Sequence, residues 1–194
     1  IANCRFEHVA KAVRIGAAKD TDKLDGIVVC DNEISETDHG AIQIEDLRAW
    51  NKTKPPFSSL GDVKVLRNKL RTIGLRAFRQ DHGHALCVGY PETMEVAGNI
   101  LERCYGAGIF VFGGKGSGET KDAALSRALI YGNRAEDTLL AANDWGGIEN
   151  WQGGPFYVYN NISGNANGYW NWSYKPDKPA SGRLGFAYYL DGAF

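Results

Sequence analysis

The sequence has no uninterrupted apolar run of eighteen residues, so no segment is expected to cross a membrane as a helix. Residues 1–6 show neither a basic start nor a long apolar stretch, and no signal peptide is visible. The net charge is only -1, so the chain lacks the basic excess with which nucleic-acid-binding proteins contact phosphates. We therefore expect no membrane span and no nucleic-acid partner.

Metal-binding and redox cysteine motifs are also missing. The four cysteines Cys4, Cys30, Cys87 and Cys104 include no Cys-x-x-Cys pair, which would be typical of zinc or of a redox dithiol. We predict no metal site and no cofactor. Free cysteine is among the most buried residue types, so we expect these residues to be small fillers of the interior, with one disulfide as the alternative.

What the sequence does contain is an internal repeat. Five segments share an apolar residue, two variable positions and then asparagine: Val29–Asn32, Val65–Asn68, Val96–Asn99, Ile130–Asn133 and Val158–Asn161. Residues 1–6 fit as a sixth, with Cys4 in the asparagine position. The unit recurs about every thirty residues with variable spacing, which is typical of a solenoid that tolerates insertions in its loops.

A tight bend is predicted just before each repeated asparagine. The preceding positions are Asp31, Arg67, Gly98, Gly132 and Asn160. This set is rich in residues that accept left-handed backbone angles at low cost. The asparagines are then expected to stack on one another and to hydrogen-bond through their side-chain amides.

A second short strand is predicted after each bend, where glycine opens an apolar segment. Alternation along a strand places Ile42, Ala85, Phe110 and Ile148 inward. The residues expected on the outside are Gln43, Leu86, Val111 and Glu149. The 24 glycines further disfavour a helical protein.

Over essentially its whole length the sequence resembles the right-handed parallel β-helix families of carbohydrate-active proteins, which are pectate-lyase-like in fold. The resemblance lies in the Val-x-x-Asn repeat and in residues 144–148, which are similar to the Asp-x-Gly-Gly-Ile stretch of some β-helical glycoside hydrolases. We expect an all-β, right-handed parallel β-helix of about six rungs. Residues 1–194 are expected to form one domain, with an aromatic-rich C-terminal rung and loop at 164–194.

The resemblance implies a secreted or cell-surface protein with a polysaccharide or oligosaccharide as its partner. The chain is expected to be a segment of a longer one, because Ile1 begins in the middle of a rung without a capping helix.

The expected alignment of the rungs gathers carboxylates into a column formed by Asp38, Asp81, Gly106 and Asp144. Neighbouring rungs lie about 4.8 Å apart, so carboxylate separations of roughly 5 and roughly 10 Å are available. Glycoside hydrolysis needs two carboxyl groups about 5 Å apart for retention, or roughly 6.5 to 9.5 Å apart for inversion. The predicted catalytic residues are Asp144, Glu149 and Asp81.

Imidazole and aromatic side chains beside this column are predicted to bind the sugar. Tryptophan faces can stack on sugar rings, and histidine can hydrogen-bond hydroxyl groups. The predicted substrate-binding residues are His82, Asp38, His39, Trp145, Trp151 and Trp170. These residues also have structural explanations that involve no substrate. Asp38, Asp81, His39 and His82 could cap turns, and the tryptophans could pack under a loop.

Two other functions fit the same pattern. A polysaccharide lyase would use a base near a uronate, with Ca²⁺ as its possible cofactor. A non-catalytic glycan-binding or structural β-helix of a surface protein would use the fold without a catalytic pair. Unsaturated products would identify the lyase, and glycan retention without release of reducing ends would identify the binding protein.

Overall fold

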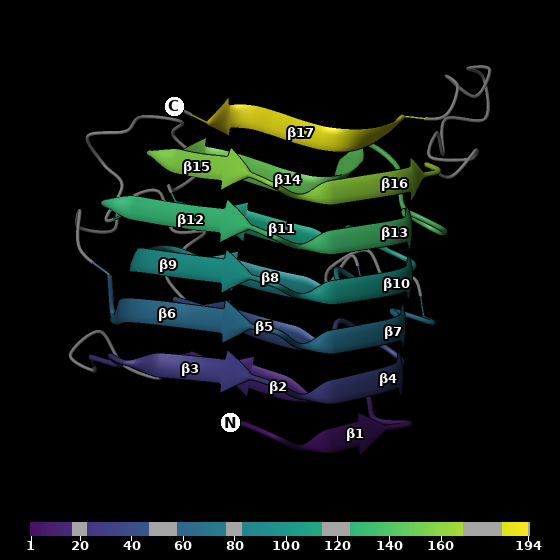
Figure 1. Ribbon diagram of the computed structural model, residues 1–194, viewed down its shortest axis with the longest axis horizontal. Coiled ribbons are helices and arrows are strands. Elements are labelled where there is room, and N and C mark those ends of the chain that lie inside the picture. Colours follow the sequence, from purple (N-terminus) through teal and green to yellow (C-terminus); the bar gives the residue numbers. More distant parts are fainter. Residues whose placement is uncertain (17–22, 47–57, 77–82, 114–124, 169–183, 194) are drawn as a thin grey trace, which may run out of the picture.

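The computed structural model describes residues 1–16, 23–46, 58–76, 83–113, 125–168 and 184–193. Within these ranges the chain is all-β, with three sheets whose strands pair in parallel. Neighbouring strands in each sheet are three places apart in the chain, so successive strands lie in the three sheets in turn. Figure 1 shows the resulting stack of layers, from β1 at one end to β17 at the other. This arrangement is consistent with the expected solenoid.

The sheets are named here by their first strands. The β1 sheet contains β1 (Arg5–Glu7), β4 (Glu33–Thr37), β7 (Lys69–Ile73), β10 (Ile100–Cys104), β13 (Arg134–Thr138) and β16 (Ile162–Ala166). The β2 sheet contains β2 (Val13–Ile15), β5 (Ile42–Glu45), β8 (Leu86–Gly89), β11 (Ile109–Phe112), β14 (Trp145–Gly153) and β17 (Gly185–Ala193). The β3 sheet contains β3 (Ile27–Cys30), β6 (Leu60–Leu66), β9 (Pro91–Ala97), β12 (Arg127–Tyr131) and β15 (Phe156–Tyr159).

The repeated asparagines form the predicted ladder between the β3 and β1 sheets. The Nδ2 groups of Asn32, Asn68, Asn99 and Asn133 each donate to Oδ1 of the next asparagine at 2.9 to 3.0 Å. Asn161 is the last acceptor. At the other end the backbone N–H of Cys4 donates to Asn32 Oδ1 at 3.0 Å, which confirms that Cys4 occupies the asparagine position.

The bends before these asparagines also match the prediction. The φ angles of Asp31, Arg67, Gly98, Gly132 and Asn160 lie between 53° and 65°. Because this left-handed conformation turns the chain from one sheet into the next, the buried amide ladder sits at the same corner in each layer. Each asparagine satisfies backbone groups there, as in the bond from Asn99 Nδ2 to the Val65 carbonyl at 2.9 Å.

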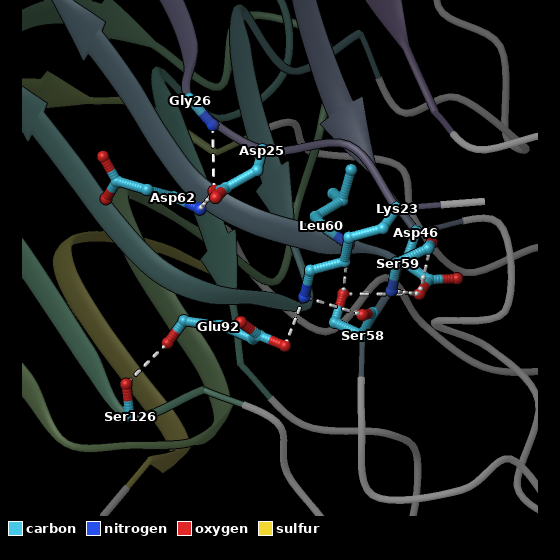
Figure 2. Close-up of polar contacts among 10 residues, drawn as sticks. All are labelled: Lys23, Asp25, Gly26, Asp46, Ser58, Ser59, Leu60, Asp62, Glu92 and Ser126. Carbon is cyan, nitrogen blue, oxygen red and sulfur yellow. Dashed lines mark hydrogen bonds and ion pairs between the residues drawn. The ribbon is translucent and has the colours of Figure 1, made fainter. Parts of the chain in front are cut away.

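A second corner is held by carboxylates and hydroxyls that join neighbouring layers (Figure 2). Asp46 is buried and accepts hydrogen bonds from the backbone N–H and the Oγ of Ser59, both at 2.8 Å. Lys23 contacts Glu92, whose carbonyl accepts from Ser126 Oγ at 2.9 Å. These contacts fix the chain where it enters the β3 sheet.

The interior is one apolar cluster enclosed by the three sheets. In the β2 sheet the inward positions are in register as Ile42, Leu86, Ile109 and Ile148. The expected alignment was therefore wrong for the middle two layers, where Ala85 and Phe110 had been placed in this column. The glycines lie at different offsets from the inward residue in different layers, so they do not mark the register.

The cysteines divide into two groups. Cys87 and Cys104 are buried, as expected, whereas Cys4 is exposed and Cys30 is partly exposed. None of the four forms a disulfide, so the alternative of a disulfide is wrong. The described residues contain no apolar helix long enough for a membrane span.

Candidate functional site

A cavity of about 520 Å³ lies on the outer side of the β2 sheet. Its floor follows the register of the sheet, in which Gln43, Cys87, Phe110, Glu149 and Tyr189 form one outward column. The residues that line it are Lys11, Gly40, Gln43, Glu45, His84, Cys87, Phe110, Asp144, Trp145, Glu149, Trp151, Tyr189 and Asp191. The cavity therefore crosses the strands from the first layers of the sheet to the last.

Glu149 provides a buried carboxyl group in this cavity. Its side chain is only 2% exposed, and Oε2 accepts a hydrogen bond of 2.8 Å from the backbone N–H of Gly146. The pKa of Glu149 is raised to about 8, chiefly by burial and also by the negative charges of Asp191 and Asp144, which together outweigh the opposing effect of the Gly146 hydrogen bond. A carboxyl group with this pKa retains its proton at neutral pH and can act as an acid.

Asp144 and Asp191 approach Glu149 from two neighbouring strands. Asp144 immediately precedes β14 at a φ of 64°, and its backbone N–H donates to the Leu184 carbonyl at 2.7 Å. Asp191 lies on β17 in register with Trp151, two residues beyond the partner of Glu149. Since the Glu149 side chain bonds back to Gly146, its carboxyl group lies near the start of β14, the strand that Asp144 precedes.

Aromatic rings form one side of the cavity. Phe110 lies at 5.1 Å from Trp145 and at 6.3 Å from Trp151, measured between ring centroids. Phe112 packs against Trp151 at 6.1 Å and occupies the space left by Gly89, where a Cβ would lie 2.1 Å from the Phe112 ring. The two tryptophans thus pack on a buried cluster while they also line the cavity, so packing and sugar stacking are compatible.

His84 was not among the predicted site residues. Its Nδ1 accepts a hydrogen bond of 3.0 Å from the backbone N–H of Ala107, and its ring lies 4.6 Å from that of Trp145. Because the amide can only donate, the neutral imidazole carries its hydrogen on Nε2. His84 therefore brings a ring with a fixed tautomer to the cavity.

The end of the cavity nearest β2 is polar. Lys11 donates to Gln43 Oε1, and Gln43 Nε2 donates to Glu45 Oε1 at 2.8 Å. None of these three residues was predicted to belong to the site. The outward positions of Gln43 and Glu45 follow from β5, in which they alternate with the buried residues Ile42 and Ile44.

The structure brings together four of the predicted residues: Asp144, Trp145, Glu149 and Trp151 all line the cavity. Asp38 and His39 lie outside its lining, and the Asp38 carboxylate contacts Arg76 Nε at 3.3 Å instead. Asp38 belongs to the layer of β5, three strands from β14, which is the separation that the expected column gave Asp38 and Asp144. Three predictions, Asp81, His82 and Trp170, fall outside the described residues.

Among the residues that the structure describes, no group of three or more His, Cys, Asp and Glu side chains is arranged to hold a metal ion. No protein-family model, no curated protein and no solved structure matches this chain.

Proposed function

We propose that this chain is a right-handed parallel β-helix that hydrolyses glycosidic bonds of a polysaccharide or oligosaccharide, with Glu149 as the proton donor. The observation that carries the proposal is the buried Glu149 carboxyl group, whose pKa is raised to about 8 in a cavity that it shares with three more carboxyl groups. Glycosidases use such a protonated carboxylic acid to protonate the leaving oxygen.

Asp144 is the proposed partner carboxylate. It precedes the strand of Glu149, and its charge contributes to the raised pKa of Glu149. In the proposed reaction Asp144 either activates a water molecule or attacks the anomeric carbon, while Glu149 gives its proton to the departing oxygen. Asp191 then has a tuning role, because its charge holds the Glu149 proton in place.

The other lining residues have matching roles in sugar binding. Trp145 and Trp151 offer apolar ring surface on which the non-polar face of a sugar can stack. The ring of His84 packs edge-on against that of Trp145 while the Ala107 amide holds its Nδ1, so His84 helps to fix the orientation of the Trp145 ring for sugar stacking.

A screen of polysaccharides tests the proposal. The wild-type chain and the Glu149→Gln variant would be incubated with arabinoxylan, arabinogalactan, xyloglucan and polygalacturonate. Release of reducing ends by the wild type only, without near-ultraviolet absorbance of the products, is the expected result. Absorbing, unsaturated products would indicate a lyase, and retention of a polysaccharide on an affinity gel without release would indicate a binding protein; either result would overturn the proposal.

A further inference from the structure

The polar end of the cavity lies far from the proposed reaction. Gln43 occupies the same outward column as Glu149, with β8 and β11 between their strands. Three strand spacings correspond to roughly 14 Å. A single sugar ring that contacts Glu149 cannot also contact Gln43, so the residues at the β2 end have no part in bond cleavage itself.

The floor between the two ends is continuous and largely apolar. Cys87 and Phe110 fill the column between Gln43 and Glu149, and both line the same cavity. A sugar ring above them would lie against a thiol and an aromatic ring, without a charged group in the floor of this column. A chain of sugars can therefore extend from Glu149 across the strands to Gln43.

The polar residues at the far end suit hydroxyl groups. The Gln43 amide is oriented by its bonds with Lys11 and Glu45, so ammonium, amide and carboxylate groups lie side by side. Sugar hydroxyls both donate and accept hydrogen bonds, and such a mixed set can satisfy both functions. Orientation of the amide before binding reduces the entropy cost of recognition.

The charge of the lining favours a neutral sugar. Among the described lining residues four carry carboxyl groups, Glu45, Asp144, Glu149 and Asp191, whereas Lys11 carries the one cationic side chain and no arginine is present. A chain of uronates would bring further carboxylates into this cavity against like charge. A neutral glycan meets no such opposition.

We infer that Lys11, Gln43 and Glu45 form a distal subsite that binds a neutral glycan several sugars away from the bond that is cleaved. This inference rests on the proposed hydrolase function. It adds that the enzyme acts on chains in preference to single glycosides, and that Gln43 is a specificity-determining residue.

The test compares substrates of increasing length. Oligosaccharides of two to six sugars would be prepared from whichever of arabinoxylan, arabinogalactan and xyloglucan is hydrolysed. For the wild type, kcat/KM should rise with length until the chain reaches Gln43. Gln43→Met, which preserves size but not hydrogen bonding, should lower kcat/KM about 10-fold for the long substrates and leave the shortest unchanged. Lys64→Met, on the outer side of β6, serves as the control and should change neither.

The outcomes separate the two proposals. Failure to hydrolyse any of the polysaccharides would overturn the hydrolase function and this inference with it. Hydrolysis with a wild-type kcat/KM independent of length would overturn the distal subsite alone, whether or not the Gln43 variant is stable. An equal loss of kcat/KM at every substrate length in Gln43→Met would also contradict the distal subsite. Cleavage of polygalacturonate as fast as of the neutral polymers would contradict its preference for a neutral glycan.

Discussion

Gly146 and Glu149 are joined by a hydrogen bond of 2.8 Å, from the backbone N–H of the glycine to Oε2 of the glutamate. The bond turns the Glu149 side chain back along β14, and its carboxyl group is buried instead of extending into solvent. Gly146 also lacks a side chain where a Cβ would lie 3.0 Å from the Cβ of Tyr189, which allows β17 to pack closely against β14.

Replacement of the proton donor should abolish activity without loss of folding. Glu149→Gln keeps the size of the side chain and can still accept the Gly146 hydrogen bond, but it cannot supply a proton. We expect kcat to fall by about 10²- to 10⁴-fold. Glu136→Gln, on the outer side of the β1 sheet, is the matched control and should retain wild-type kcat. A Glu149→Gln enzyme within a few-fold of the wild type would contradict the role of Glu149.

The two aspartates should have separable effects. Asp144→Asn removes the proposed base or nucleophile and should lower kcat about 100-fold or more at every pH. Asp191→Asn removes a charge that raises the pKa of Glu149, so the basic limb of the kcat profile should move to lower pH with a smaller change in the maximum. Steady-state kinetics between pH 4 and 9 measure both effects. Equal profiles for the two variants would argue against this division of roles.

Stability should depend on pH through Glu149. Its pKa is raised from 4.5 to about 8 on folding, so between these values the folded state binds more protons than the unfolded state. The free energy of unfolding therefore contains a contribution that is fully present below pH 4.5 and is lost as the pH rises towards 8. Denaturant titrations should show a weaker decline over this range for Glu149→Gln than for the wild type. Identical slopes would contradict the raised pKa.

The asparagine ladder should account for a large part of the stability. Asn99 is completely buried and bonds to Asn68, Asn133 and the Val65 carbonyl. Asn99→Ala leaves several of these groups unpaired, so we expect a loss of about 3 kcal/mol in the free energy of unfolding. Asn167→Ala removes an exposed side chain that bonds to a backbone carbonyl at 2.8 Å, and it should cost less than about 1 kcal/mol. Urea unfolding measures both values. Similar losses of unfolding free energy in the two variants would contradict a large contribution of the ladder to stability.

The asparagine positions could be predicted because one physical requirement recurs in every layer. Each bend needs a residue with a left-handed backbone conformation, and the next position needs a side-chain amide that can be buried. Few residue types suit the second of these positions. The strands of the β2 sheet were harder to align. The position of the glycine before each strand is determined by the local turn geometry and not by the register of the sheet. Leu86 and Ile109, the true inward residues, adjoin Ala85 and Phe110, so an error of one position exchanged the two faces.

The site was predictable only where its residues are close in the sequence. Asp144, Trp145, Glu149 and Trp151 lie within eight positions, and they were found together. Lys11, His84 and Asp191 come from other layers, and they meet the others only through the strand pairing. The sequence offered one signal for Asp191, because it alternates with Tyr189 along one strand and so lies on the same face. This signal could place Asp191 in the site only once the pairing of β17 with β14 was known.

The pKa of Glu149 is the quantity on which the proposed mechanism depends. A ¹³C NMR titration of the side-chain carboxyl groups, with the Glu149 resonance assigned by its loss in Glu149→Gln, measures it without any substrate. We predict a midpoint near 8. A midpoint near 4.5, the ordinary value for glutamate, would mean that Glu149 is ionised at neutral pH and would remove the proposed proton donor.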